Sequence, residues 1–132
     1  MGILGLGTDL VEVARVRQAL ERHGERFRSR VLTAGERREG DMRPDPAQHL
    51  ALRFAAKEAG AKALGTGLRG VRLRDLEVRR DPGGPPRLVL DGGAAERAGK
   101  LGVERIHLSL SDEGGFALAT VILEGGDPAG QG

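Results

Sequence analysis

The stretch "RFAAKEAGAKALGTG", from Arg53 to Gly67, begins with helix-forming residues and ends in glycines. With the residues before it, this stretch predicts a helix over about 47–64, for which Gly65 is a natural C-terminal stop. Gly60 lies inside the helix, where a glycine costs about 1 kcal/mol relative to alanine. The other residues small enough to let two backbones approach are Ala55, Ala56, Ala59 and Ala63. We therefore expect this helix to pack closely against another backbone.

The segments around this helix predict an α+β fold in which an antiparallel sheet packs on the long helix. The expected order is a glycine-rich strand over 2–8, a helix over 12–22, a short helix after the capping box of Thr33 and Glu36, the long helix, a hairpin over 76–90, a short helix over 91–102, and two paired strands over 105–111 and 116–123. This order is typical of α+β proteins and not of regular βαβ repeats. We expect one domain over 1–124 and a disordered tail over 125–132.

The composition limits the class of protein. The chain has 132 residues, which is one domain by length, and no cysteine, so disulfides and zinc–thiolate sites are excluded and a cytoplasmic location is the default expectation. No apolar run approaches the 18 residues of a membrane span. The net charge is only +2, yet arginines crowd the segment 14–32. Such a basic patch favours an acidic partner, either nucleic acid or an acidic protein. Aromatic residues make up 2% of the chain, which argues against stacking on single-stranded bases.

Three side chains of the long helix fall on one stripe, because Phe54, Glu58 and Lys62 are spaced by four. By itself this spacing fits an ordinary surface ion pair between Glu58 and Lys62. In the same way, Asp9 could simply cap the helix that follows it. Asp9 nevertheless ends an apolar strand, where solubility requires no acid. Two carboxylates together with phosphate oxygens and waters are what Mg²⁺ needs, so Asp9 and Glu58 are candidate metal ligands.

A phosphate group would complete this pattern. Lys62 lies one turn beyond Glu58 and can neutralise a phosphate charge. The turn Gly65–Thr66–Gly67 offers bare amides and a hydroxyl, but the C-terminal end of a helix repels anions. Any phosphate contact there must therefore come from loop amides and Lys62. On the strand "RIHLSLS", His107 shares a polar face with two serines, where a structural role is the simpler interpretation.

The segments "GLGTDLVEVARV" and "RFAAKEAGAKALGTG" together strongly resemble the holo-[acyl-carrier-protein] synthases, the small bacterial 4'-phosphopantetheinyl transferases. The marks of that family are a strand running into G-x-D and, about fifty residues later, F-A-A-K-E-A-x-x-K-A-x-G-T-G. Both stand nearly unbroken here, at Gly7 to Asp9 and at Phe54 to Gly67. The resemblance extends over about residues 2–124 and includes the strand "HLSLSD" before a final apolar strand.

Two positions depart from the family pattern. The family usually has a second histidine after the serine pair, where this chain has Asp112. An essential catalytic role for that histidine is therefore doubtful here. The family hairpin usually reads G-K-P, whereas here it reads Gly84-Pro85-Pro86, so a lysine contact to coenzyme A is missing. Arginines such as Arg80 or Arg87 are candidates to replace it.

The resemblance implies an activity. The family moves the phosphopantetheine arm of coenzyme A onto a serine of an apo carrier protein and releases adenosine 3',5'-bisphosphate. Carried over by position, Asp9 and Glu58 would bind Mg²⁺ with the pyrophosphate, and Lys62 would steady the leaving phosphate. Either Glu58 or a water on the metal would take the serine proton. The remaining positions that the resemblance assigns are Arg53, Lys62, Gly65, Thr66 and His107 for coenzyme A, and Arg15, Arg22 and Arg26 for the acidic carrier protein.

The resemblance also implies a homotrimer with active sites between neighbouring subunits. The residues agree in one respect: the final strand, "FALATVIL", is continuously apolar, so we expect it to need cover on both faces.

Two other functions are possible from the residues alone. A nucleotide-binding regulator would use the glycine-rich strand, but "GLGTDL" lacks the third glycine of G-x-G-x-x-G. A small RNA-binding protein would explain the arginines but not the two carboxylates.

Overall fold

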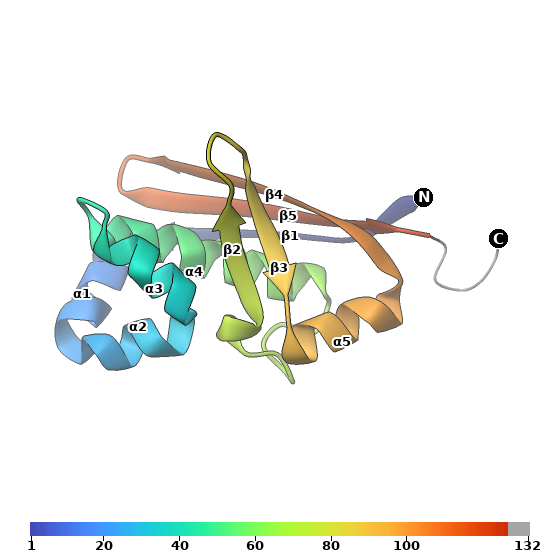
Figure 1. Ribbon diagram of the computed structural model, residues 1–132, viewed down its shortest axis with the longest axis horizontal. Coiled ribbons are helices and arrows are strands. Elements are labelled where there is room, and N and C mark those ends of the chain that lie inside the picture. The colour runs from blue at the N-terminus through green and yellow to red at the C-terminus, as the bar shows by residue number, and fades with distance from the viewer. Residues whose placement is uncertain (127–132) are drawn as a thin grey trace.

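The chain folds as an α+β domain with two antiparallel sheets, which confirms the predicted fold class (Figure 1). The computed structural model describes residues 1–126. The larger sheet has the strand order β1-β5-β4, and the smaller one is the hairpin of β2 and β3. The bounds of the strands are Gly2–Glu12 for β1, Leu76–Arg80 for β2, Pro86–Leu90 for β3, Val103–Glu113 for β4 and Phe116–Gly125 for β5.

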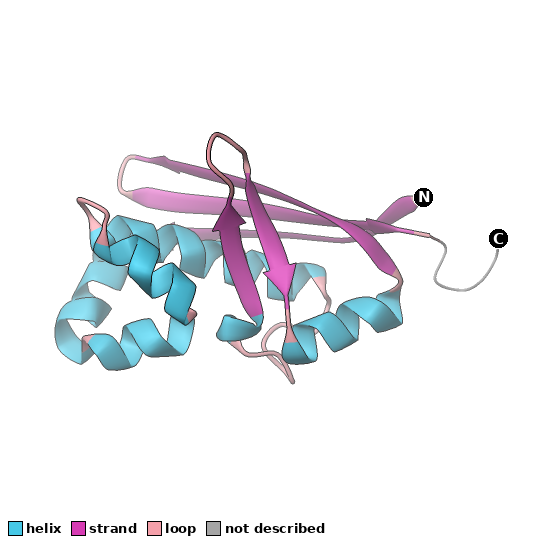
Figure 2. Ribbon diagram, viewed as in Figure 1, coloured by secondary structure: helices cyan, strands magenta, loops and turns pink. Residues whose placement is uncertain are grey.

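The helices gather on one side of the three-stranded sheet, with the long helix α4 beneath it (Figure 2). Their bounds are Val13–His23 for α1, Glu25–Val31 for α2, Ala34–Asp41 for α3, Pro46–Ala63 for α4 and Gly92–Leu101 for α5, with a short 3-10 helix at Leu73–Asp75. None of the helices in the described part of the chain is long and apolar enough to cross a membrane.

The structure differs from the expected elements in three places, at two strand ends and at one additional helix. Strand β1 continues past Asp9 to Glu12, because β5 pairs with it along this whole length. Helix α2 was not predicted; it follows directly on Gly24, whose positive φ of 54° turns the chain between α1 and α2. Strand β5 extends to the buried Gly125, two residues beyond the expected strand over 116–123. Of the expected tail, residues 127–132 lie outside the described part of the chain.

Close packing of α4 against β1 depends on two glycines of the strand. A Cβ atom at Gly5 would lie 2.0 Å from the carbonyl oxygen of Ala63, and one at Gly7 would lie 1.9 Å from that of Ala59. No larger residue fits there, because the obstacle is helix backbone and not a flexible side chain. The expected approach of two backbones is therefore confirmed, and it brings the end of β1 directly onto α4.

The other side of α4 holds the small sheet. A Cβ atom at Gly60 would come within 2.6 Å of the Leu76 side chain of β2 and 2.9 Å of the Leu88 side chain of β3. Both leucines are buried. Gly60 thus has the packing role that its position inside a helix suggested. Helix α4 is enclosed between the two sheets, which is why most of its residues are buried.

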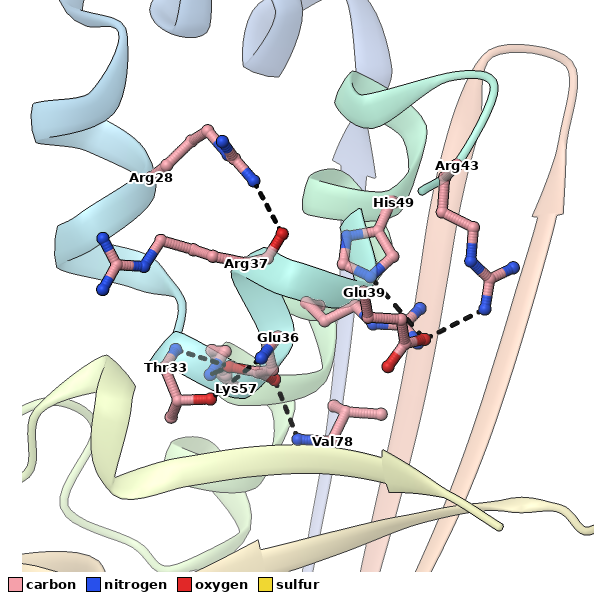
Figure 3. Close-up of polar contacts among 10 residues, drawn as sticks. Arg28, Thr33, Glu36, Arg37, Glu39, Arg43, His49, Lys57 and Val78 are labelled. Carbon is pink, nitrogen blue, oxygen red and sulfur yellow. Dashed lines mark hydrogen bonds and ion pairs between the residues drawn. The ribbon is translucent and has the colours of Figure 1, made fainter. Parts of the chain in front are cut away.

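A buried ion pair joins α3, α4 and β2 (Figure 3). The Lys57 Nζ atom lies 2.7 Å from Glu36 Oε1, and both side chains are almost completely shielded from solvent. The ammonium also donates to the backbone carbonyl oxygen of Leu76, at 2.5 Å. The carboxylate accepts hydrogen bonds from the backbone N–H of Thr33 and of Val78, both at 2.9 Å. The predicted capping box of Thr33 and Glu36 is present and contributes part of this network.

The outer face of the three-stranded sheet is left open in the single chain. Along β5, Ala117, Ala119, Val121 and Leu123 are buried against the helices, whereas the alternate residues face outward. Within one chain "FALATVIL" is therefore covered on its inner face only, because helices pack on one face of the sheet, and the chain itself does not provide the expected cover of the other face. The large apolar side chains of this sheet that are exposed are Ile3 at 71%, Leu6 at 64%, Leu10 at 61%, Phe116 at 43% and Leu118 at 40%.

We predict that Gly7→Ala lowers the free energy of unfolding by about 1–3 kcal/mol or more, because the new methyl group must displace helix backbone. A matched control is Gly99→Ala in α5, where a Cβ atom meets nothing within 4 Å. There the substitution is expected to raise stability by about 0.5–1 kcal/mol. Urea unfolding of both variants measures the difference, and equal stability of the two would contradict the packing role of Gly7.

Candidate functional site

The candidate site is a groove between the end of β1, helix α1 and helix α4. Its volume is about 340 Å³. The residues that line it are Asp9, Leu10, Val11, Glu12, Arg15, Val16, Ala19, Phe27, Phe54 and Glu58. Phe54 and Glu58 of the predicted stripe thus face the same space as Asp9, although more than forty residues separate them from it in the sequence. The close packing of α4 on β1 at Gly7 produces this meeting.

Asp9 and Lys62 form an ion pair at the edge of the groove. The Lys62 Nζ atom lies 3.2 Å from Asp9 Oδ1 and 3.0 Å from the carbonyl oxygen of Thr8. Asp9 lies within β1, and the residue at the N-cap of α1 is Glu12, so Asp9 is not a helix cap. Within the described residues Lys62 makes no ion pair with Glu58. Both of the ordinary interpretations that the sequence allowed are therefore wrong.

Glu58 faces the groove from α4 and is partly buried. Burial raises the pKa of its carboxyl group, and the nearby Asp9 carboxylate raises it further, while Lys62 acts in the opposite direction. Ionised Glu58 is thus held close to a second negative charge that Lys62 compensates only in part. A group of like charges that lacks full compensation attracts cations.

The two carboxylates fit a magnesium site of the kind that needs a substrate to complete it. Among residues 1–126, no three or more His, Cys, Asp or Glu side chains gather as metal ligands. Mg²⁺ is commonly held by one or two carboxylates together with waters and substrate phosphates, and seldom by an all-protein cage. Asp9 and Glu58 would be the protein ligands of such a site, and the exposed Lys62 contacts Asp9.

The turn that follows α4 has fewer free amides than its sequence suggested. The Gly65 N–H donates to the Lys62 carbonyl at 3.0 Å, and the Gly67 N–H donates to the Ala61 carbonyl at 3.2 Å. Both glycines have positive φ values, 82° and 58°, as these helix-ending contacts require. The amides of Gly65 and Gly67 are therefore already used to complete the end of the helix. The Thr66 hydroxyl donates to the carbonyl of Gly67.

Arg53 lies on the opposite side of α4 from Glu58. Its Nη2 atom donates to Glu39 Oε1 at 2.8 Å, and the residue is only 5% exposed. Burial lowers the pKa of the Arg53 guanidinium, although Glu39 raises it. Arg53 borders a separate cavity of about 260 Å³, which is also lined by Asp112, the residue that replaces the second family histidine. One chain therefore does not bring Arg53 to the groove of Asp9.

Beside Glu39 lies His49, a buried histidine that the sequence gave no reason to single out (Figure 3). Burial and the charge of Arg53 lower the pKa of His49 to about 4, so the ring is neutral at pH 7. Its Nε2 atom is 3.8 Å from Glu39 Oε1, and neither ring nitrogen has a hydrogen-bond partner within the described residues. Gly40 makes room for the ring, since a Cβ atom there would lie 2.8 Å from His49 Nδ1.

His107 lies on the outer face of the sheet, as the alternation of β4 predicted. It pairs with Ile122 in the register of β4 and β5, and its Nε2 atom is 3.0 Å from Glu124 Oε1. Asp9 points to the inner face, toward α4, where Lys62 contacts it. The sheet thus separates His107 from the groove within one chain.

The predicted docking arginines border the groove or lie close to it. Arg15 lines it, and its side chain is 84% exposed beside Glu12. Arg22 is exposed one heptad further along α1. Arg26 lines a neighbouring cavity of about 220 Å³ together with Phe27, which also lines the groove. A basic surface with one aromatic side chain therefore leads to the two carboxylates.

Comparison with known proteins agrees with this arrangement. The chain matches the family model described as the 4'-phosphopantetheinyl transferase superfamily over residues 5–121. It is 52% identical, over 123 residues, to holo-[acyl-carrier-protein] synthase of Vibrio cholerae serotype O1 strain M66-2, covering 92% of this chain and 98% of that protein. This chain belongs to the holo-[acyl-carrier-protein] synthase family. The predicted resemblance is thereby confirmed.

Solved structures of the synthase family share the fold. The crystal structure of the synthase from Neisseria meningitidis has a TM-score of 0.86 and 39% identity, covering 92% of this chain and 98% of that chain. The Bacillus anthracis synthase, solved in complex with CoA (3',5'-ADP), has a TM-score of 0.79 and 35% identity, covering 95% of this chain and 99% of that chain. The α+β arrangement of this chain is therefore the arrangement of the synthase family.

Sequence reasoning missed Lys57, whose buried ion pair with Glu36 positions the candidate site of this synthase family member. Lys57 follows Phe54 by three residues and precedes Glu58 by one, so it lies about 100° from Glu58 around the helix. The apolar and small residues on both sides of it are the signal that it faces the core. Its partner Glu36 was predicted as part of a capping box but not as a buried charge.

Proposed function

We propose that this chain transfers the 4'-phosphopantetheine group of coenzyme A to a serine of an apo acyl carrier protein, in the cytoplasm and with Mg²⁺. The observation that carries this proposal is the meeting of Asp9, Glu58 and Lys62 at one groove, beside the arginine face of α1. Acyl carrier protein and coenzyme A are the proposed partners, and neither nucleic acid nor a membrane takes part.

In this reaction the serine Oγ atom forms a bond to the β-phosphorus of coenzyme A, and the bridging P–O bond of the pyrophosphate breaks. Adenosine 3',5'-bisphosphate leaves with the bridging oxygen, and the serine proton passes to a base. Negative charge grows on the leaving phosphate, so catalysis depends on positioning and on neutralisation of charge. Lys62, whose ammonium is about half exposed, is placed to meet that charge.

Asp9 and Glu58 would hold the Mg²⁺ ion, which supplies charge neutralisation for the pyrophosphate oxygens when bound. Burial and then the nearby Asp9 carboxylate raise the pKa of Glu58, and a cation bound beside Glu58 would offset both effects. Lys62 keeps Asp9 oriented through the contact of its Nζ atom with Asp9 Oδ1.

For coenzyme A, we propose contacts with Arg53, Lys62, Gly65, Thr66 and His107. Within one chain these residues lie on different sides of α4 and of the sheet. A pocket that uses all of them requires a second subunit that brings its own His107 or Arg53 to the groove of the first. The proposed homotrimer with sites between subunits meets this requirement.

The open face of the sheet supports the assembly. Leu6, Leu10 and Leu118 are each at least 40% exposed on one surface, and a second subunit would remove them from water. The number three follows from the family resemblance. For the carrier protein, the basic face of α1 with Arg15, Arg22 and Arg26 is the proposed docking surface.

The metal proposal is tested by Asp9→Asn and Glu58→Gln. Each variant is expected to lose about 10²–10³-fold in turnover, since one group that stabilises the transition state is removed. At pH 7, Glu58→Gln should be at least as stable as the wild type, because the raised pKa shows that the ionised form of Glu58 is disfavoured in the folded chain.

Thermal unfolding with Mg²⁺ and adenosine 3',5'-bisphosphate gives a second readout. Mg²⁺ and adenosine 3',5'-bisphosphate together should raise the unfolding temperature of the wild type, and both variants should lose this effect. A control is Glu96→Gln on α5, whose side chain is 71% exposed beside Lys100, which should behave as the wild type. Normal Mg²⁺-dependent turnover in either folded variant would show that the altered residue is not a metal ligand.

The assembly proposal is tested by mass in solution. Light scattering of the wild type should give about three times the monomer mass of 14.0 kDa. Leu118→Arg, in the centre of the open sheet face, should give a folded monomer with little turnover, because a charge cannot be buried there without a partner. A wild-type monomer with full activity would contradict the shared site.

The docking proposal is tested by the double variant Arg15→Glu, Arg22→Glu. We expect its KM for the carrier protein to rise at least about tenfold at low salt, whereas its affinity for coenzyme A stays the same. The difference in carrier KM between the wild type and the double variant should become smaller at 1 M salt, where the screening length is about 3 Å. The control is Lys100→Glu, an exposed charge reversal on α5. An unchanged carrier KM would place docking elsewhere.

A further inference from the structure

Arg97 of helix α5 lies at the C-terminal end of α4, and none of the roles proposed above involves it. Its Nε atom donates to the carbonyl oxygen of Leu64 at 3.0 Å. Its Nη2 atom lies 3.5 Å from the position that a Cβ atom would take at Gly65. Among the described residues its two terminal nitrogens have neither a hydrogen-bond acceptor nor an acidic partner. One nitrogen of the guanidinium is thus fixed to the end of the helix, and Nη2 lies beside the glycine turn.

The electrostatics of this end of α4 require such a charge if an anion binds there. The C-terminal end of a helix carries a partial negative charge, equivalent to about half an elementary charge, which repels phosphate. The amides of Gly65 and Gly67 cannot compensate for it, because they donate to the carbonyls of Lys62 and Ala61. The ammonium of Lys62 points away from the turn, to Asp9. A positively charged side chain from another element would offset the negative charge of this helix end.

We propose that Arg97 binds a phosphate group of coenzyme A at the Gly65–Thr66–Gly67 turn. The inference rests on the proposed function, since it concerns the same substrate. The bond from Nε to Leu64 fixes the plane of the guanidinium, so that Nη1 and Nη2 present two parallel donors, the arrangement that matches two oxygens of one phosphate. The same bond offsets the negative end of α4. Arg97 thereby supplies the contact that the sequence suggested for the loop amides.

The competing explanation is that Arg97 only completes the helix end. Two substitutions separate the explanations. Arg97→Gln keeps a side-chain N–H donor for the Leu64 carbonyl but removes the charge. Arg97→Lys keeps the charge but loses the paired donors. Lys100→Gln on the same helix removes an equal charge from an exposed pair with Glu96 and is the matched control.

Isothermal titration of coenzyme A into the full-length protein tests the proposal. Arg97→Gln should bind at least about five-fold more weakly than Lys100→Gln at low salt, and Arg97→Lys should lie between Arg97→Gln and the wild type. The loss should shrink as salt rises, because screening weakens a contact between charges. The carrier KM should be unaffected. Thermal unfolding of each variant without ligand establishes that it is folded.

Three outcomes would overturn the inference. The first is that Arg97→Gln matches Lys100→Gln in affinity while a folded Arg97→Met variant binds weakly, which would leave Arg97 a purely structural cap. The second is that all Arg97 variants bind coenzyme A as the wild type does. If Arg97→Gln does not fold, a folded Arg97→Lys variant with an unchanged salt dependence and affinity decides against the contact. Failure of the wild type itself to bind coenzyme A would instead contradict the proposed function.

Discussion

The buried ion pair between Lys57 and Glu36 is the interaction on which the site depends. Each charge lost its hydration when the chain folded, and removal of one partner from such a pair typically costs about 3–5 kcal/mol because the other is left uncompensated. The pair joins α3, α4 and β2 around one carboxylate. It fixes the rotation of α4 about its axis, since Lys57 must face the core. Glu58, the next residue, is then directed toward β1 and α1.

Close contact between backbones sets the second constraint. The carbonyl groups of Ala59 and Ala63 approach β1 so closely that the strand needs glycine at positions 5 and 7. The strand cannot slide along α4 without a clash between a side chain and helix backbone. Asp9, two residues beyond Gly7, is therefore held opposite Glu58 and Lys62. Burial, and next to it the repulsion of the Asp9 carboxylate, raises the pKa of Glu58 at this position.

The helix α4 separates two sets of polar groups. On the groove side lie Glu58 and Lys62, and on the other side Arg53 lies with Glu39 and the neutral His49. The open sheet face carries His107, separated from both. A small domain with helices on only one face of its sheet leaves that face apolar and exposed. The same feature supports the proposed interface between subunits and the proposed substrate pocket that two subunits would share.

The sequence by itself determined the fold class, the long helix, the hairpin and the candidate residues at Asp9, Glu58 and Lys62. Periodicity, turn glycines and two long motifs are local, so they can be found without coordinates. The tertiary structure decided which of these residues meet. It excluded a cap role for Asp9, committed the amides of Gly65 and Gly67 to the helix end, and placed Arg53 and His107 away from the groove. Such outcomes depend on contacts between segments distant in the chain. Strand β5 is an example: the apolar pattern "FALATVIL" indicates that the strand needs apolar cover. Whether helices or another subunit provide that cover is decided by what packs on each face of the sheet.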